Sequence, residues 1–157
     1  MEILGQLPSI LNQLRQRGLT LEIKGCIHIG AHEGQEYPLY KQFGIQNLLF
    51  YEALPENFKK LEENTKNDPH IDIRNIALGN QNGTVEMFLE ERGLSSSVLE
   101  PAYHLKQYPQ IAFDKKTTVN ITRLDDEEFD VSKYNFINID VQGYELNVLK
   151  GAEKTLE

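Results

Sequence analysis

The feature that most constrains this chain is a short apolar run that ends in a glycine-rich bend, residues 25–36. The run covers Cys26 to Ile29, and Gly30 and Gly34 lie in the bend. In α/β proteins such a junction joins a buried strand to a helix and delivers a nucleotide-like ligand to the carboxyl end of the strand. The two glycines would let a ligand approach the main chain closely. The same spacing is also compatible with an ordinary strand-to-helix turn.

Length and charge narrow the classes of protein to which the chain can belong. Its 157 residues predict one domain with a core of its own. The 16 basic and 24 acidic residues give a net charge of −8, which argues against nucleic-acid binding and against docking on an anionic membrane. A single cysteine, Cys26, excludes an intrachain disulfide, and its apolar neighbours predict a core position. No apolar run reaches the roughly 18 residues of a membrane span, so we expect a cytoplasmic protein.

Strands and helices alternate along the chain. An amphipathic helix is expected within residues 1–20, and the main domain within residues 21–157. Strands are predicted at residues 25–29, 47–52, 71–78, 84–89, 117–124 and 135–141. Helices are predicted at residues 36–43, at residues 55–65 and after Gly143, where the apolar stripe consists of Leu146, Leu149, Ala152 and Leu156. This order predicts a mostly parallel sheet with helices packed against it, to which residues 71–78 and 84–89 add an antiparallel pair.

Two segments do not follow these patterns. Residues 92–116 include Ser95, Ser96, Ser97 and Pro101 and predict a long loop, which in a compact domain is often functional. Residues 125–130 are mostly acidic and predict a solvated surface turn rather than a metal site. The four histidines are scattered, and none stands at ligand spacing from Asp140 or Glu145, so no metal is expected.

Acidic residues follow two of the predicted strands, Glu52 after the second and Asp140 after the last. An acid about 20 residues beyond the bend is placed to accept hydrogen bonds from ribose hydroxyls. The dinucleotide fingerprint needs a middle glycine against the pyrophosphate, but His32 stands at that place, and Glu33 would repel phosphate. A phosphate-free adenosine ligand, S-adenosylmethionine, therefore suits the loop better than NAD. A nicotinamide-dependent oxidoreductase remains the less favoured alternative.

Five blocks of sequence, in this order, resemble the FkbM-type S-adenosylmethionine-dependent methyltransferases. They are residues 27–34, 50–55, 75–79, 95–97, and 139–145 followed by 148–152. The last block is the most specific, because it is similar to a D-x-E-G-x-E signature followed by LKGA. The resemblance implies a Rossmann-like class I methyltransferase sandwich, with helices on both faces and a seven-stranded sheet in the order 3-2-1-4-5-7-6. Strands beyond the last helix would be missing from this chain, and a homodimer could cover the edge that they leave.

The resemblance also implies an activity and a set of site residues. The activity is O-methylation of a hydroxyl on a sugar, a glycan or a secondary metabolite. Cofactor contacts would come from His28, Gly30, His32, Gly34, Glu52, Asn75, Ala77 and Asp140. The acceptor hydroxyl would be bound or deprotonated by Asp140, Gln142 and Glu145.

The chain departs from the family pattern at three positions. His28 replaces an aspartate, His32 stands where asparagine is common, and Gln142 replaces a glutamate. Asp140 could instead be a cofactor contact, and Glu145 a first-turn acid favoured by the helix dipole. A degenerate, non-catalytic Rossmann-like domain therefore stays open as an alternative function.

Overall fold

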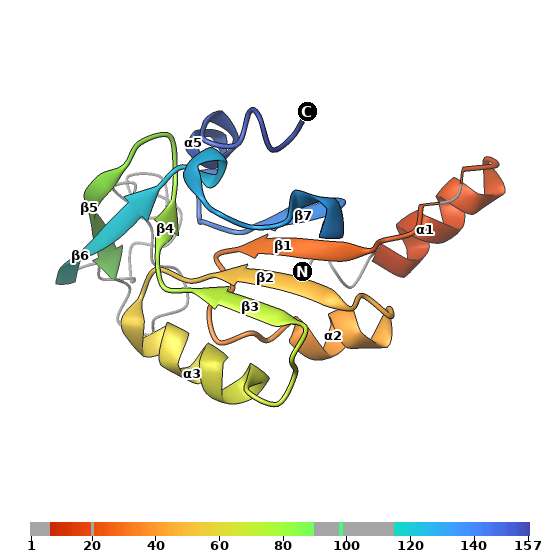
Figure 1. The fold of residues 1–157 in the computed structure, drawn as a ribbon, viewed down its shortest axis with the longest axis horizontal. Coiled ribbons are helices and arrows are strands. Elements are labelled where there is room, and N and C mark those ends of the chain that lie inside the picture. Colours follow the sequence, from red (N-terminus) through yellow and green to blue (C-terminus); the bar gives the residue numbers. More distant parts are fainter. Residues whose placement is uncertain (1–6, 20, 90–97, 99–114) are drawn as a thin grey trace, which may run out of the picture.

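The structure is a computed structural model that describes residues 7–19, 21–89, 98 and 115–157, and it has an α/β fold (Figure 1). Four parallel strands form the central sheet in the order β3-β2-β1-β7. Their bounds are β1 Gly25–Ile29, β2 Asn47–Tyr51, β3 Ile71–Arg74 and β7 Phe136–Ile139. The prediction of a mostly parallel sheet is confirmed.

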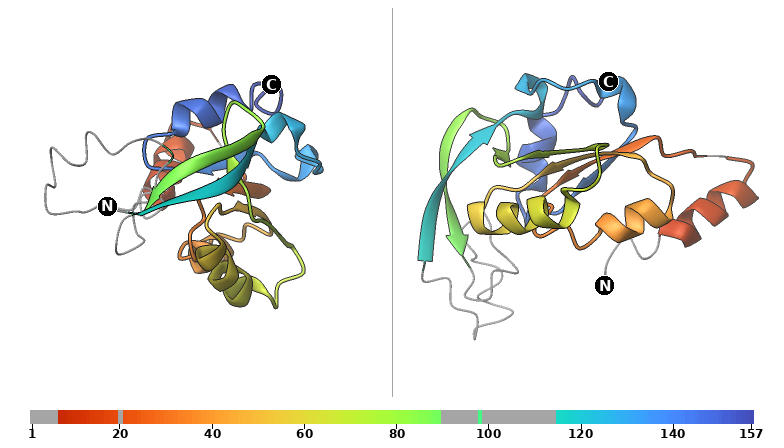
Figure 2. Two further views of the ribbon diagram at one scale, coloured as in Figure 1. Left: turned by 90° about the vertical axis from the view of Figure 1, so that its left-hand side faces the viewer. Right: turned by 60° about the horizontal axis from the view of Figure 1, so that its bottom comes forward.

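Helices cover both faces of this sheet, as Figures 1 and 2 show. Helices α2 (Tyr37–Gln42) and α3 (Pro55–Thr65) lie on one face, and α5 (Glu145–Lys150) lies on the other. Successive side chains of a strand point to opposite faces. Accordingly, Cys26 packs in a cluster with Tyr40 and Leu61, whereas Ile27 packs in the cluster that contains Val148. All five residues of β1 are buried, which explains why its sequence is mostly apolar, with His28 as the exception.

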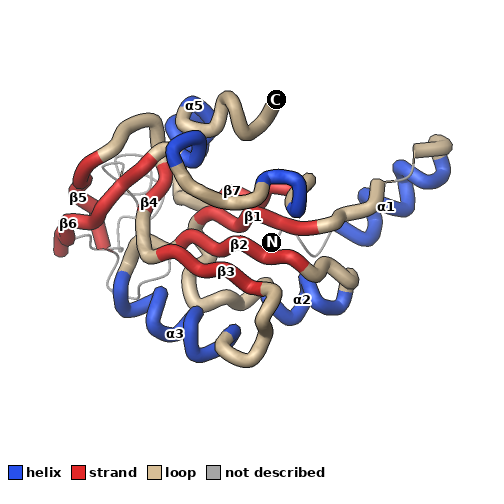
Figure 3. Tube along the Cα trace, viewed as in Figure 1, coloured by secondary structure: helices blue, strands red, loops and turns tan. Residues whose placement is uncertain are grey.

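A second, smaller sheet stands beside the carboxyl ends of the central strands (Figure 3). It consists of β4 (Ala77–Leu78), β6 (Lys115–Thr122) and β5 (Gly83–Leu89), in that order. Strand β6 runs parallel to β4 and antiparallel to β5. Two short 3₁₀ helices, Leu124–Asp126 and Val131–Lys133, connect β6 to β7.

The run at residues 71–78 is not one strand, which corrects the prediction. It divides at Asn75 into β3, which pairs with β2, and β4, which pairs with β6. The predicted antiparallel partner of residues 84–89 is wrong for the same reason, because β5 pairs with β6 instead. The backbone N–H of Gly79 donates to the carbonyl of Thr122 at 2.9 Å, so the chain leaves β4 alongside β6 before it turns.

The predicted apolar stripe of the last helix is wrong for its three leucines, whereas Ala152 is buried as predicted. Leu146, Leu149 and Leu156 are 62%, 40% and 50% exposed, and α5 ends at Lys150. The buried side instead carries Tyr144, Val148 and Ala152, which recur every four residues.

Helix α1 (Leu7–Gln16) stands away from both sheets in Figures 1 and 2, and its Ile10 is 42% exposed. The division of the chain into residues 1–20 and 21–157 stays a prediction. Most of the predicted loop at residues 92–116, with Ser95, Ser96 and Ser97, lies outside the described residues. In the part of the chain that the structure describes, no helix has the length and apolarity needed to cross a membrane.

The sequence predicted that Asp125 is a solvated surface acid. Its carboxylate is instead buried and hydrogen bonded to the turn at residues 154 and 155. Its side chain is fully buried. One carboxylate oxygen accepts from the backbone N–H and the hydroxyl of Thr155, each at 2.9 Å. The other accepts from the backbone N–H of Lys154 at 3.2 Å and from the Arg123 guanidinium at 3.1 Å. Burial would raise the pKa of Asp125, but these hydrogen bonds and the Arg123 charge together hold it below its ordinary value.

Replacing Asp125 by asparagine should lower the free energy of unfolding by about 2–3 kcal/mol, because buried donors lose their charged acceptor. The pKa is lower in the folded state, so this contribution is present above the unfolded value, roughly 3.9, and is lost as the pH falls through the folded value. Thermal unfolding followed by circular dichroism from pH 3 to pH 7 measures both effects. The control replaces the exposed neighbour Asp126 by asparagine. An equal loss of unfolding free energy in the two variants would show that the hydrogen bonds of Asp125 do not stabilise the fold.

Candidate active site

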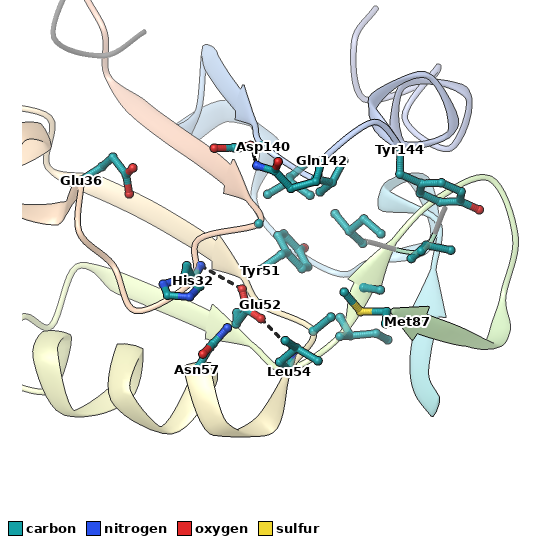
Figure 4. A pocket seen from close by; sticks show the side chains of 18 of the residues that line it. His32, Glu36, Tyr51, Glu52, Leu54, Asn57, Met87, Asp140, Gln142 and Tyr144 are labelled. Atoms are coloured by element: carbon teal, nitrogen blue, oxygen red, sulfur yellow. Dashed lines mark hydrogen bonds between the residues drawn. The ribbon is translucent and has the colours of Figure 1, made fainter. Parts of the chain in front are cut away.

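A cavity of about 270 Å³ opens at the carboxyl ends of β1, β2 and β7, where the small sheet meets the large one (Figure 4). Its volume lies near the lower end of the roughly 300–1,000 Å³ typical of small-molecule sites. Its polar lining includes His32, Glu36, Glu52, Asn57, Asp140 and Gln142. Its apolar lining includes Leu54, Ile76, Ala77, Met87, Val98 and Tyr144. The cavity is therefore lined by both polar and apolar side chains.

The bend after β1 brings three strand ends together. Gly30 has φ +84°, and a Cβ at this position would lie 2.0 Å from the backbone oxygen of Asp140. The N–H groups of Gly30 and Ala31 both donate to the carbonyl of Tyr51, at 2.9 and 3.0 Å. Only glycine combines this conformation with so close an approach to another backbone. Gly30 therefore joins the ends of β1, β2 and β7 at the base of the cavity.

Glu52 lies immediately after β2 and reaches the cavity, although only 6% of its surface is exposed. Its two oxygens accept from the N–H groups of His32 and Leu54, each at 2.8 Å, and Asn57 also hydrogen bonds to the carboxylate. Desolvation raises the pKa of Glu52, and these hydrogen bonds oppose that rise. The acid thus ties the loop after β1 to the loop after β2.

Asn75 stabilises the loop after β2. Its side-chain amide donates to the carbonyls of Glu52 and Ala53, at 2.8 and 3.1 Å, and it does not line the cavity. Ala77, two residues later, does line it. The break between β3 and β4 therefore gives Asn75 a positioning role and brings Ala77 to the wall.

The turn after β7 carries the predicted acceptor-side residues. Asp140 and Gln142 line the cavity, and the Gln142 amide donates to the Asp140 carboxylate at 2.6 Å. Glu145 does not line it; its carboxylate accepts from the N–H groups of Val141 and Gly143, at 3.3 and 3.0 Å. Desolvation raises the pKa of Asp140, and the charge of Glu145 adds to the rise. This turn can therefore present a carboxylate that is more basic than usual.

Two cavity residues have a left-handed backbone without being glycine. They are His32, with φ +50°, and Gln142, with φ +54°. His32 lies in the loop after β1 and Gln142 in the loop after β7, so they stand on opposite sides of the cavity (Figure 4). Non-glycine residues in this region are uncommon and cluster at functional sites. The two left-handed residues therefore point to the same cavity as the polar lining residues do.

Comparison with known proteins identifies the family of the chain. The family model for the methyltransferase FkbM domain matches residues 28–157, which include the last two residues of β1, all of β2 and β7, and every residue that lines the cavity. The chain belongs to the FkbM methyltransferase family. The family resemblance of the five sequence blocks is thereby confirmed.

Two known proteins are similar to this FkbM domain. The 2-O-methyltransferase NoeI of Sinorhizobium fredii (strain NBRC 101917 / NGR234) is 28% identical over 140 residues, which are 83% of this chain and 58% of the relative. The chain thus spans little more than half the length of that relative. A crystal structure of methyltransferase FkbM from Methylobacillus flagellatus KT matches 90% of this chain and 32% of the solved chain, with a TM-score of 0.56 and 17% identity. This second likeness shows the shared fold.

Not every predicted site residue reaches the cavity of the FkbM domain. Gly30, His32, Glu52, Ala77, Asp140 and Gln142 line it. Gly34, Asn75, Glu145 and His28 do not. Gly34 faces Leu61 of α3, and His28 is 2% exposed in the core, where its Nδ1 lies 3.1 Å from the Tyr40 hydroxyl. Burial lowers the pKa of His28 to about 4, which keeps the ring neutral.

The sequence did not single out several lining residues of the FkbM domain. Gln35 and Glu36 follow the glycine bend, and their place in a loop after a strand could have marked them. Met87 lies on β5 of the second sheet, so no local pattern identifies it as a lining residue. Val98 also lines the cavity. Among the described residues no group of three or more His, Cys, Asp or Glu side chains is placed to hold a metal ion.

Proposed function

We propose that this protein transfers a methyl group from S-adenosylmethionine to a hydroxyl oxygen of a sugar, a glycan or a secondary metabolite. The observation that carries the proposal is the position of Glu52. It follows β2, lines the cavity and lies across it from Asp140 (Figure 4). In this arrangement one acid can hold a ribose while the other faces the acceptor.

The donor set around Glu52 fits an adenosine group. A carboxylate has about four acceptor positions. Two take the N–H groups of His32 and Leu54 and a third takes Asn57, so capacity remains for a ribose hydroxyl. Beside it, Leu54, Ile76 and Ala77 offer an apolar surface for a flat base. The residues that would hold the donor are therefore Gly30, His32, Glu52 and Ala77.

The charge of the lining favours this donor over a dinucleotide. Glu36, Glu52 and Asp140 contribute carboxylates, and the described lining residues include no lysine or arginine. A pyrophosphate would face three like charges there, whereas a sulfonium cation would be attracted. The oxidoreductase alternative is disfavoured on this ground.

In the proposed reaction S-adenosylmethionine supplies a methyl carbon made electrophilic by a positively charged sulfur. Asp140 accepts the proton of the acceptor hydroxyl as that oxygen bonds to the methyl carbon, and the electrons of the broken carbon–sulfur bond stay on sulfur. Gln142 orients the Asp140 carboxylate through its 2.6 Å hydrogen bond. Glu145 acts as a positioning residue, because it holds the two N–H groups of the turn. Alignment of the reacting atoms can contribute roughly 7–11 kcal/mol, more than proton transfer alone.

Calorimetry tests the proposal directly. We expect S-adenosylhomocysteine to bind and NAD not to bind. Binding of neither would favour a non-catalytic domain, and binding of NAD alone would overturn the proposal. A screen with donor-labelled methyl groups against hydroxylated acceptors then identifies the acceptor. The homodimer and the cytoplasmic location stay predictions, which light scattering and cell fractionation can test.

Replacing Glu52 by alanine should weaken S-adenosylhomocysteine binding at least tenfold, because a hydrogen bond to a charged group contributes about 1.5–3 kcal/mol. Calorimetry on folded protein measures the loss. Glu56, an exposed acid in the first turn of α3, provides the matched alanine control. An unchanged dissociation constant in the Glu52 variant would refute the ribose assignment.

A further inference from the structure

Strand β7 is the last strand on one side of the central sheet. Among the described strands it pairs with β1 alone in that sheet, so its other edge is open. Its four residues, Phe136–Ile139, are each partly exposed, whereas every residue of β1 is buried. A strand at the edge of a sheet presents N–H and C=O groups with which another strand can pair. The open edge of β7 can therefore accept a further strand.

The two edges of the central sheet differ in their protection against such pairing. Strand β3, at the opposite edge, carries the ion pair of Asp72 and Arg74. Charged side chains are one of the means by which edge strands avoid pairing with other chains. Strand β7 contains neither a charged residue nor a proline, and three of its four side chains are apolar. The composition of β7 is therefore that of a strand with neighbours on both sides.

Apolar side chains are exposed on the segments that precede and follow β7. Helix α5 and the turn after it lie on the β7 side of the sheet in Figures 1 and 2. On α5, Leu146 and Leu149 are 62% and 40% exposed, and their spacing of three residues places them next to each other on the helix surface. Leu156 follows in the turn, and Val131 precedes β7 in a 3₁₀ helix; both are at least half exposed. Exposed apolar groups that gather in this way mark interaction sites.

We propose that the open edge of β7 and the exposed leucines of α5 form the interface of a symmetric homodimer. The two β7 strands pair antiparallel across a two-fold axis perpendicular to the sheet, which joins the central sheets of the two copies. Such an axis keeps both α5 helices on the same face, so Leu146 and Leu149 of the two copies pack against each other. A two-fold interface uses the same patch of both subunits, so one unprotected edge per chain is sufficient. The proposal goes beyond the proposed function, because it rests on the fold alone.

The charges beside this edge favour a second copy as the occupant. The chain carries a net charge of −8, so two copies repel each other over most of their surfaces. The segment of residues 145–157 is nearly balanced, with the acids Glu145, Glu153 and Glu157 and the bases Lys150 and Lys154. In an antiparallel pair of α5 helices, Lys150 at the end of one helix faces the acidic first turn of the other. Within the described ranges Lys150 and Lys154 form no ion pair, so their charges can serve the partner.

Sedimentation equilibrium of the full chain tests the interface. We expect the wild type to reach twice its mass of 18.1 kDa as the concentration rises. Replacing Leu146 and Leu149 together by lysine should weaken the dimer at least 100-fold, because both side chains lie at the centre of the proposed contact. The matched control replaces Ile10 and Leu19 by lysine; these residues are 42% and 58% exposed on or directly after α1, which stands away from both sheets. The control should leave the dimer unchanged, and circular dichroism verifies that both variants are folded.

Hydrogen exchange then tests the part of β7 in the interface. We expect amides of β7 that point away from β1 to exchange more slowly in the wild-type dimer than in the leucine variant. A wild type that stays monomeric up to roughly 200 µM would leave the edge to a different partner and overturn the homodimer. A dimer that survives both lysines, or whose β7 amides exchange as fast as in the monomer, would place the interface elsewhere and overturn the proposal.

Discussion

Replacing Asp140 by asparagine is expected to lower kcat for methyl transfer by about 10²- to 10⁴-fold, the range that a positioned general base contributes. The dissociation constant of S-adenosylhomocysteine should stay close to the wild-type value, because Glu52 and the loop after β1 remain in place. The reason for the loss is that asparagine keeps the shape of Asp140 and its contact with Gln142 but cannot take a proton. Single-turnover measurements with labelled donor separate this chemical step from binding.

The pH dependence of the same reaction provides a second measurement. A base works when it is ionised, so kcat should fall as the pH drops through the Asp140 pKa, which lies above the ordinary aspartate value. Glu145→Gln removes a negative neighbour and should move this limb to lower pH. Asp72, an exposed acid of β3, provides the asparagine control with an unchanged profile. A wild-type rate in the Asp140 variant would leave alignment alone to explain catalysis.

Replacing Gly30 by alanine should destabilise the fold by about 2–5 kcal/mol. A left-handed alanine costs roughly 1–2 kcal/mol, and forcing an atom into a packed site costs about 1–3 kcal/mol more. The added Cβ would lie 2.0 Å from the backbone oxygen of Asp140, which no side-chain rotation can relieve. We expect the midpoint of thermal unfolding to fall by roughly 5–15 °C.

Gly44 offers a matched control for the conformational part of this loss. Its φ is +76°, close to that of Gly30, but an added Cβ would meet nothing within 4 Å. Gly44→Ala should therefore cost only about 1–2 kcal/mol. Because the clash also pushes β1 from β7, the Gly30 variant should bind S-adenosylhomocysteine more weakly as well. Equal unfolding midpoints for the two alanine variants would show that the close approach to Asp140 is not a constraint.

Local patterns were sufficient for two strands of the central sheet, β1 and β2. Continuous apolar runs marked β1 and β2 because both faces of these strands are covered, and Pro55 marked the first residue of α3. The pattern at residues 71–78 was misleading, because an apolar run does not show where hydrogen bonding changes from one sheet to another. The leucines of the last helix were misleading because the buried face was set by Tyr144, Val148 and Ala152.

The candidate site was predictable to the extent that its residues end strands. Glu52 and Asp140 follow β2 and β7, and parallel strands bring their carboxyl ends to one edge. The direction of a side chain was not predictable in the same way. His28 was expected to contact the cofactor, but its side chain points into the core, where it contacts Tyr40 of α2. Contacts such as that between Gln35 and His32 depend on how a loop turns, which residue type and spacing do not specify.

The left-handed backbone of His32 and Gln142 lowers the stability of the fold, but their side chains belong to the candidate site. Glycine would relieve roughly 1–2 kcal/mol at His32 and at Gln142, so a selection for thermostable variants alone should recover glycine at both positions. The same exchanges would remove an imidazole from one wall and the amide that orients Asp140 from the other. Engineering of this domain for thermal stability should therefore keep His32 and Gln142 and change other positions.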